Sequence, residues 1–310
     1  MKLLFVVDPL AGLKAYKDSS VAMMRAAARR GHAVYACEAR HLHVAAGVAR
    51  ARCAALEVRD EADWYRVASA EARVLTDFDA TIMRSDPPVD TDYLLTTHLL
   101  GVAEANGARV LNRPSALRDF NEKLAILNFP QFVAPTLVTA DAGAINGFLA
   151  EHGDIIVKPL TEMGGAGIFR LTPADPNRNA ILETLTQRGR RAIMAQRYLP
   201  EISAGDKRIL LIAGEIVPWA LARIPLAGET RGNLAAGGTA RAQALSARDR
   251  EIAETIAPWA KARGIFLAGL DVIGAALTEI NVTSPTGFQE ITAQTGFDVA
   301  AMFVEALERG

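Results

Sequence analysis

The sequence predicts an α/β protein with a parallel sheet in its N-terminal part, and three observations lead to this fold class. The chain has 310 residues, which is about two domains at roughly 100–200 residues per domain. Half of the residues are hydrophobic and 22% are charged, a globular composition that excludes a disordered or collagenous chain. Over residues 1–112, short apolar runs typical of strands alternate with longer runs typical of helices. Such alternation favours a parallel sheet with helices on both faces.

Residues 1–120 are predicted to form an N-terminal domain. Its expected strands are Leu3–Val7, Ala33–Cys37, Ala80–Met83 and Arg109–Leu111. Asp18 or Ser19 can cap a helix that continues to Arg30, because both side chains accept hydrogen bonds from free backbone N–H groups. A second helix is expected from about Thr91 to Asn106, with Gly107 after it as the C-cap.

Two smaller units follow, at residues 121–200 and 201–310. The central unit is predicted to hold strands Ile155–Val157, Ile168–Leu171 and Ala192–Gln196, with a helix over Asn177–Arg188. The C-terminal unit is predicted to hold strands Arg208–Ile212, Glu215–Pro218, Phe266–Ile273 and Leu277–Asn281, with helices over Ala247–Arg263 and from about Asp298. Ala213-Gly214 fits a hairpin turn between the first two of those strands.

Charge and cysteine content argue against several classes of protein. The net charge is −1, so we expect neither a nucleic-acid partner nor an anionic membrane surface. Cys37 and Cys53 form no Cys-x-x-Cys pattern, which favours reduced thiols in a cytoplasmic protein. The apolar run Leu3–Val7 is ended by Asp8-Pro9, so it predicts a buried strand and not a secretion signal.

An acidic hairpin near the C-terminus is the first candidate site. With Gly274–Ala276 as a three-residue loop, Asp271 lies opposite Glu279, and strand periodicity puts Asn281 on the same face. Two opposed carboxylates repel, and a divalent cation removes that conflict; three oxygen-bearing side chains suit Mg²⁺. The alternative is a solvated acidic face that binds nothing.

A buried lysine before a glycine-rich turn is the second candidate site. Lys158 ends the apolar run Ile155–Val157, and burying its charge is costly unless an anion meets it. The turn Gly164–Gly167 follows, and its glycines allow backbone N–H groups to approach a phosphate. The order of residues fits neither a Walker A nor a dinucleotide-binding motif. The alternative is a plain glycine hairpin with a surface lysine.

Two further segments carry residues suited to anions. Ile224–Gly238 is a long glycine-rich stretch with Arg231, and Arg223 precedes it. It fits a loop that closes over a phosphorylated intermediate, or an inert surface loop. Arg84 follows a buried strand, and the helix start at Asp18 could receive a carboxylate.

These segments together resemble the bacterial glutathione synthetase family of the ATP-grasp superfamily. The resemblance covers nearly the whole chain in the same order. It is carried most specifically by residues 228–238 (GETRGNLAAGG) and 278–286 (TEINVTSPT), with support from Asp8-Pro9, 17–20 (KDSS), 83–88 (MRSDPP), 121–123 (NEK), 158–160 (KPL), 163–165 (MGG), Gln196, 198–200 (YLP), 205–208 (GDKR) and 222–225 (ARIP).

The resemblance implies an ATP-grasp fold, in which an N-terminal parallel-sheet domain precedes two α+β subdomains that hold ATP between them. It implies ATP-dependent ligation of γ-glutamylcysteine to glycine through an acyl phosphate, in a cytoplasmic and commonly homo-oligomeric enzyme that uses Mg²⁺, or alternatively Mn²⁺. Phosphorylation turns a poorly electrophilic carboxylate into an acyl phosphate, and cationic groups neutralise the transferred phosphoryl group.

Site roles carried over by position fall into four groups. The ATP-binding residues would be Lys123, Lys158, Gly164, Gly165, Gln196, Tyr198, Leu199, Asp206 and Arg208. The Mg²⁺ ligands would be Asp271, Glu279 and Asn281. The dipeptide would be bound by Asp18, Ser19 and Arg84, and the acceptor end would be shaped by Arg231, Asn233, Ser284, Pro285 and Thr286. Arg208, Arg223 and Arg231 would be the catalytic cations, with Arg223 at the developing oxyanion.

One departure and three rival readings accompany the resemblance. The family usually has Asp-Gly before Met-Gly-Gly, whereas this chain has Thr161-Glu162, which stiffens the turn and adds negative charge near the expected triphosphate. The nearer rival is an ATP-grasp ligase with another acidic peptide and another amine. A nucleotide-binding regulatory protein without turnover, and more distantly a nicotinamide oxidoreductase, are the others.

Overall fold

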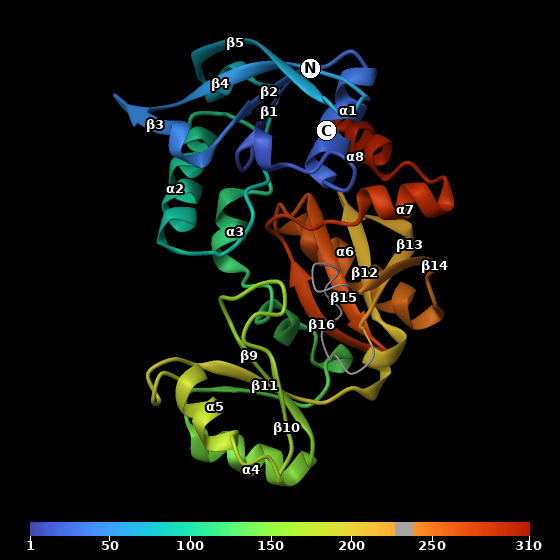
Figure 1. The fold of residues 1–310 in the computed structure, drawn as a ribbon. Coiled ribbons are helices and arrows are strands. Elements are labelled where there is room, and N and C mark those ends of the chain that lie inside the picture. The colour runs from blue at the N-terminus through green and yellow to red at the C-terminus, as the bar shows by residue number, and fades with distance from the viewer. Residues whose placement is uncertain (227–237) are drawn as a thin grey trace.

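The computed structural model describes residues 1–226 and 238–310, which fold around three β-sheets (Figure 1). The first sheet contains strands from residues 2–111, the second from residues 136–197 and the third from residues 206–281. The third sheet lies between the other two in the molecule, although it comes last in the chain. In the part of the chain that the structure describes, no helix is both long and apolar enough to cross a bilayer.

The parallel centre of the first sheet forms as the sequence predicts. Its four parallel strands are β1 (Lys2–Val6), β2 (Ala33–Cys37), β6 (Ala80–Met83) and β7 (Val110–Leu111), in the order β2-β1-β6-β7. Three helices belong to this part of the chain: α1 (Ser19–Arg29), α2 (Thr91–Ala105) and α3 (Pro114–Asp119). Asp18 caps α1 by accepting hydrogen bonds from the backbone N–H groups of Ser20 (2.7 Å) and Val21 (3.0 Å).

Three antiparallel strands that the sequence analysis did not predict make this sheet mixed. They are β3 (Leu42–Ala45), β4 (Val48–Val58) and β5 (Tyr65–Val74), and β4 pairs with β2. Most side chains of β5 are exposed, so it lacks the alternating apolar pattern that identifies a half-buried strand. Ala46 and Gly47 both have positive φ and close a two-residue hairpin between β3 and β4.

The second sheet is antiparallel and carries the predicted lysine strand in its interior. Its strands are β8 (Thr136–Thr139), β9 (Ile155–Pro159), β10 (Phe169–Leu171) and β11 (Ile193–Arg197), in the order β10-β9-β11-β8. Helices α4 (Ala142–His152) and α5 (Arg178–Leu185) lie together against it (Figure 1). Lys158 is therefore fixed on a strand that has a neighbour on each side.

The third sheet is also antiparallel and carries the acidic hairpin. Its strands are β12 (Asp206–Ile212), β13 (Glu215–Ile224), β14 (Thr239–Ala244), β15 (Leu267–Ile273) and β16 (Ala276–Asn281), in the order β14-β13-β12-β15-β16. Helix α6 (Ala247–Ala262) packs on β12, β13 and β15. Helices α7 (Phe288–Thr295) and α8 (Val299–Arg309) return to α1, which joins the C-terminal segment to the first sheet.

The acidic hairpin has the predicted pairing but not the predicted loop. Its turn contains only Gly274 and Ala275, because Ile273 pairs with Ala276. Thr278 is an extra residue on β16, and this bulge restores the pairing of Asp271 with Glu279. The prediction of the loop length was therefore wrong by one residue, whereas the prediction that the two carboxylates lie opposite each other is confirmed.

Candidate active site

A cavity between the second and third sheets gathers most of the predicted ATP-binding and metal-binding residues. Each of the strands β9, β11, β12, β13, β15 and β16 contributes to its wall. Of the predicted residues it is lined by Lys158, Gly164, Gly165, Gln196, Tyr198, Leu199, Asp206, Arg208, Arg223, Asp271, Glu279 and Asn281. Residues spread over more than 120 positions of the sequence thus share one wall.

The two predicted phosphate-binding lysines meet at one carboxylate oxygen. Oε1 of Glu279 lies 3.7 Å from Nζ of Lys123 and 3.6 Å from Nζ of Lys158. Both lysine side chains are buried. Burial lowers the pKa of Lys158, whereas for Lys123 the effect of burial is exceeded by Glu279 and Glu122, which raise its pKa. The charge of Lys158 is therefore compensated less fully by its neighbours than that of Lys123.

The bulge at Thr278 also provides a hydrogen-bond acceptor for Lys158. The Thr278 carbonyl accepts a hydrogen bond from Lys158 Nζ at 3.3 Å, and the Thr278 hydroxyl donates to the Asp271 carbonyl at 3.1 Å. β-bulges are common beside active sites because they redirect backbone groups. Here the extra residue turns a carbonyl toward the buried ammonium group.

Asp271 is held by two arginines. Arg208 donates to its carboxylate from Nε (2.5 Å) and Nη2 (2.9 Å), and Arg223 Nη2 lies 2.8 Å from Oδ2. Burial alone would raise the pKa of Asp271. The two guanidinium groups lower it by a larger amount, so the pKa lies well below the ordinary value. Asn281 Nδ2 also donates to Oδ2, at 3.1 Å, so the carboxylate is ionised and fixed in place.

Asp206 lies beside the same arginines with one oxygen free. Arg223 donates to its Oδ2, while Oδ1 is buried and has no hydrogen-bond partner. Burial raises the pKa of Asp206 to about 6, against the opposing effect of Arg223. Arg223 Nε is likewise buried without a partner. Unsatisfied buried polar atoms are costly, so these two atoms indicate where a polar ligand or water would bind.

The oxygen donors at the acidic hairpin fit a divalent cation. Asp271 and Glu279 are paired across β15 and β16, and the pairing of Gly269 with Asn281 places the amide one step along the same face. Among the described residues, no three His, Cys, Asp or Glu side chains form a metal site on their own. Mg²⁺ commonly takes one or two carboxylates and completes its shell with water and substrate phosphates. Two carboxylates, one amide and a free Asp206 oxygen suit such a shared site.

Glu122 is a cavity residue to which the sequence analysis gave no role. Its carboxylate is paired with Lys123, and burial together with Glu279 raises its pKa. Among the described residues around this cluster, four carboxylates face four cations: Glu122, Asp206, Asp271 and Glu279 against Lys123, Lys158, Arg208 and Arg223. The only sequence signal for Glu122 was its position next to Lys123.

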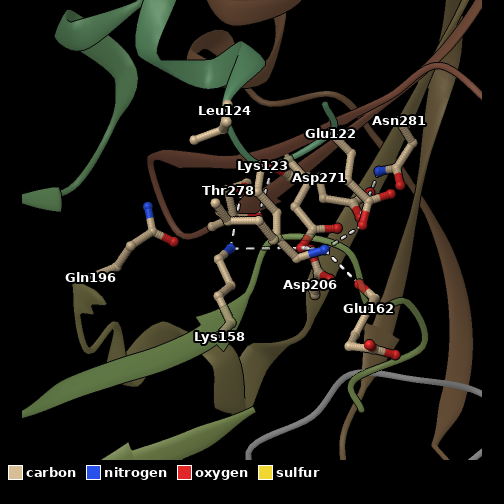
Figure 2. Close-up of polar contacts among 12 residues, drawn as sticks. Glu122, Lys123, Leu124, Lys158, Glu162, Gln196, Asp206, Asp271, Thr278 and Asn281 are labelled. Atoms are coloured by element: carbon tan, nitrogen blue, oxygen red, sulfur yellow. Dashed lines mark hydrogen bonds and ion pairs between the residues drawn. The ribbon is translucent and has the colours of Figure 1, made fainter. Parts of the chain in front are cut away.

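The glycine-rich turn lies at the cavity, and the unusual Glu162 precedes it. Gly164, Gly165 and Gly167 all have positive φ, which side-chain-bearing residues seldom adopt. A Cβ atom at Gly167 would also lie 2.8 Å from Pro159 Cγ. Lys123 Nζ donates to the backbone carbonyl of Glu162 at 2.7 Å, whereas the Glu162 carboxylate is exposed and points away from Lys123 (Figure 2).

The predicted nucleobase residues Gln196, Tyr198 and Leu199 line the same cavity. Gln196 Nε2 donates to the Thr136 hydroxyl at 2.9 Å, which fixes the amide. The Arg170 guanidinium lies 3.8 Å from the centre of the Tyr198 ring, so one face of that ring is already covered. Tyr198 can therefore offer a base its backbone or its edge more readily than its covered face.

The predicted dipeptide-binding residues gather at the carboxyl ends of β1 and β6. Arg84 is buried and donates from Nε to the Ser20 hydroxyl (3.0 Å) and from Nη2 to the Pro285 carbonyl (3.1 Å). Its Nη1 is buried without a partner, and burial lowers the pKa of Arg84. A cation with a free donor and no ion pair in the described chain is suited to a substrate carboxylate.

The Ser284–Thr286 segment lies against this group. The Ser284 hydroxyl donates to Asp86 Oδ1 at 2.5 Å, the Ser19 hydroxyl accepts from the Phe288 N–H at 3.3 Å, and Thr286 is exposed. The residues predicted for the dipeptide end and the acceptor end thus adjoin each other. Arg231 and Asn233, predicted respectively as a catalytic cation and an acceptor-end residue, lie outside the described residues.

Comparison with known proteins shows which fold the chain has. Solved structures with the same fold include the D-cycloserine synthetase DcsG (TM-score 0.69, 17% identity, 99% of each chain) and the ATP-grasp ligase PsnB (TM-score 0.63, 19% identity, 99% of this chain and 97% of that one). A model of the prokaryotic glutathione synthetase ATP-grasp domain matches residues 122–296. The molecule is therefore an ATP-dependent ligase with the ATP-grasp fold, as the resemblance implied.

The family follows from longer and closer matches. The N-terminal domain model of the prokaryotic glutathione synthetases matches residues 1–118. The chain is 59% identical to a glutathione synthetase of Neisseria meningitidis serogroup B, over 99% of this chain and 98% of that protein. It is 57% identical to that of Ralstonia nicotianae (100% and 96%) and 48% identical to that of Vibrio parahaemolyticus (100% and 98%). The chain belongs to the prokaryotic glutathione synthetase family.

Proposed function

We propose that this protein joins γ-glutamylcysteine to glycine, with ATP as co-substrate, and releases glutathione, ADP and phosphate. The observation that carries the proposal is the cluster of four cations and four carboxylates at the cavity, found in a chain of this family. Lys123 joins the cluster through Glu122 and Glu279, and the other seven residues line the cavity. Phosphoryl transfer requires fixed positive charge around the phosphates rather than a covalent group on the enzyme. The buried lysines and arginines supply that charge.

ATP would bind between a central domain of residues 121–200 and a C-terminal domain of residues 201–310. Lys123 and Lys158 would exchange Glu279 for phosphate oxygens, and backbone N–H groups at Gly164 and Gly165 would cover them. Gln196, Tyr198 and Leu199 would surround the base, and Asp206 with Arg208 would lie at the nucleotide. Glu122 would keep Lys123 oriented as Glu279 is released.

Mg²⁺ would be held by Asp271, Glu279 and Asn281, with phosphate oxygens completing the site. When bound, it supplies charge neutralisation at the transferred phosphoryl group. Release of Glu279 from the two lysines frees its carboxylate for this role. Mn²⁺ prefers the same oxygen donors and is the expected substitute.

The N-terminal domain of residues 1–120 would present the dipeptide. The free Nη1 of Arg84 would bind one substrate carboxylate, and the start of α1 at Asp18 and Ser19 would help to position another. Ser284, Pro285 and Thr286, with Asn233, would enclose the glycine. Arg208, Arg223 and Arg231 would act as the catalytic cations, with Arg223 stabilising the oxyanion as the glycine amine attacks the acyl carbon.

Oxygen transfer from the dipeptide tests the acyl phosphate directly. In the proposed reaction the cysteinyl carboxylate attacks the γ-phosphorus and ADP leaves. The glycine nitrogen then displaces phosphate, which keeps one former carboxylate oxygen. With that carboxylate labelled with ¹⁸O, mass spectrometry should find one label atom in each phosphate released. Label retained entirely in the peptide would overturn the proposal. Alanine or serine in place of glycine should yield little product if the acceptor pocket is as small as glycine requires.

A further inference from the structure

The only two cysteines of the sequence, Cys37 and Cys53, each directly adjoin the last residue pair of two antiparallel strands, β2 and β4. β2 and β4 pair Val34 with Leu56 and Ala36 with Ala54. The pairing ends there, and the same register continued by one residue on each strand places Cys37 opposite Cys53. Cys53 is itself within β4, where it pairs with Glu71 of β5, so both cysteines are fixed by regular strand geometry.

The two thiols also face the same side of the sheet. Both cysteines are free and buried, with exposed fractions of 5% and 1%, and both belong to one hydrophobic cluster with Leu42 and Leu75. Directly opposed residues of an antiparallel pair point to the same face. The negative charge that Cys53 would carry contributes to raising the pKa of Cys37, which is consistent with neighbouring sulfur atoms.

A cavity gives small molecules a way to the pair. Cys37 and Cys53 both line a cavity of about 400 Å³, together with Asp8, Glu38, His41 and Tyr65. Cavities of this size admit small organic molecules. The ATP-binding cavity contains neither cysteine, so the ligase reaction leaves this pair unused.

We propose that Cys37 and Cys53 form a reversible cross-strand disulfide by exchange with a low-molecular-weight disulfide. Opposed residues have Cα atoms about 4.5–5.5 Å apart, which lies within the 4.4–6.8 Å range of disulfides. Their Cβ atoms are about 4.5–5.5 Å apart, at or beyond the outer edge of the range that disulfides require, so the strands must draw slightly together. A bond that requires such a movement is more readily reduced than a relaxed structural disulfide.

The exchange is balanced in two steps. One cysteine thiolate attacks the small disulfide, forms a mixed disulfide and expels one small thiolate. The other cysteine thiolate attacks the protein sulfur of that mixed disulfide, forms the Cys37–Cys53 bond and expels the second small thiolate. The two protons from the cysteines protonate the two released thiolates. Two protein thiols are oxidised and one small disulfide is reduced.

Burial makes this exchange slow at neutral pH. It raises the pKa of Cys37 to about 12 and also raises that of Cys53 above its ordinary value. Since the thiolate is the attacking species, few molecules are reactive at any moment. Incubation for hours at mildly alkaline pH is therefore required for the test.

The test treats the full-length native protein with bis(2-hydroxyethyl) disulfide and follows its intact mass. We expect the loss of two hydrogen masses without any adduct, reversed by dithiothreitol. Tryptic digestion should yield peptide 31–40 cross-linked to peptide 53–59, since arginines at 30, 40, 52 and 59 define both. Cys37→Ser and Cys53→Ser variants are the matched controls, and neither should show the cross-link.

Three results would overturn the proposal. One is two mercaptoethyl adducts on the native chain, which would show that the thiols react separately. Another is a cross-link between two chains on a non-reducing gel. The third is no reaction of the native protein under conditions in which the urea-unfolded protein is fully modified. None of these readouts depends on ligase activity, so they do not test the proposed function.

Discussion

Arg208 binds Asp271 through two hydrogen bonds, from Nε to Oδ1 at 2.5 Å and from Nη2 to Oδ2 at 2.9 Å. The carboxylate expected to bind the metal is thus already neutralised by a cation of the protein. Glu279 has the same relationship to Lys123 and Lys158. A free divalent cation would add charge to a balanced cluster, whereas nucleotide and cation together bring compensating charges. We therefore expect cation and nucleotide to bind with positive coupling.

Substitution of Gly269 tests the position of Arg208. A Cβ atom at this residue would lie 2.8 Å from Arg208 Cδ and 2.9 Å from Pro285 Cβ, so Gly269→Ala should push Arg208 away from Asp271. Displacements of about 1 Å in an active site can cost about 100-fold in rate, and we expect a loss of kcat/KM for ATP of that order. Steady-state kinetics checks this. Gly147→Ala is the matched control, because nothing lies within 4 Å of its added Cβ. Unchanged kinetics for Gly269→Ala would contradict the account.

Removal of the buried lysine should impair nucleotide use. Lys158→Met deletes the charge next to Glu279 while it keeps an unbranched side chain. Loss of one preorganised charge at a reacting group commonly costs on the order of 100-fold, and we expect that decrease in kcat/KM for ATP. The exposed Lys2 provides the control Lys2→Met, which should behave as the unmodified protein. Equal activity of the Lys158→Met and Lys2→Met variants would show that Lys158 has no role in the use of ATP.

The charge of Glu162 should matter little for ATP. Lys123 contacts its backbone carbonyl, and the carboxylate is exposed. Exposed charges interact weakly in water, so Glu162→Gln should change the KM for ATP by less than about threefold. The double variant Thr161→Asp with Glu162→Gly restores the family pattern, so it changes the flexibility of the turn in addition to the charge at residue 162. Comparing it with Glu162→Gln separates the effect of flexibility from the effect of charge. A tenfold lower KM for Glu162→Gln would show that its charge does reach the triphosphate.

Asn112 should contribute strongly to stability, because it joins the first sheet to the third. Its Nδ2 donates to the carbonyls of Leu267 (2.8 Å) and Val282 (2.6 Å), and its Oδ1 accepts from the N–H groups of Phe266 (2.7 Å) and Leu267 (2.8 Å). Asn112→Ala leaves these buried groups unsatisfied, so we expect a free energy of unfolding lower by about 3 kcal/mol. Urea denaturation measures it, with the exposed Asn179→Ala as control. A loss below about 1 kcal/mol would contradict the bridging role.

The ion pair of Glu308 with Arg30 should make the thermal stability of the protein depend on pH. Hydrogen bonds from Arg30 chiefly, and also from His32, lower the pKa of Glu308 to about 2 from an ordinary value of 4.5. A depressed carboxylate pKa stabilises the folded state above the unfolded value, and this contribution is lost as pH falls toward the folded value. Glu308→Gln should therefore lower Tm at pH 7, and its difference from the parent should shrink between pH 4.5 and 2. The exposed Glu254→Gln should show no such trend.

The sequence indicated which residues share one cavity more fully than it indicated the contacts between the sheets, and the roles of those residues stay predictions. Lys158 ends an apolar strand, where a charge is costly unless it is compensated. Asp271 was placed opposite Glu279, where two carboxylates repel. Both conflicts were visible in the residues alone. The opposition of Asp271 and Glu279 was predicted with a loop one residue too long, because the bulge at Thr278 compensates for the shorter turn.

Polar contacts between residues far apart in the chain have no corresponding pattern in the sequence. Asn112 binds residues more than 150 positions away, and no local periodicity indicates those partners. Glu122 stands in the segment 121–123 that supports the resemblance, but no spacing or pattern in the sequence gave its carboxylate a role. β5 was missed because its mostly exposed side chains give it no apolar face.

The stoichiometry of the complete reaction shows whether this protein makes glutathione at the expense of ATP. Mg-ATP, γ-glutamylcysteine and glycine are supplied together and then with each one omitted, while ADP and glutathione are quantified. We expect one glutathione per ADP in the complete mixture, no glutathione in any incomplete mixture, and ADP release that requires all three substrates. ATP binding without turnover of this substrate pair, or ADP release independent of glycine, would contradict this expectation.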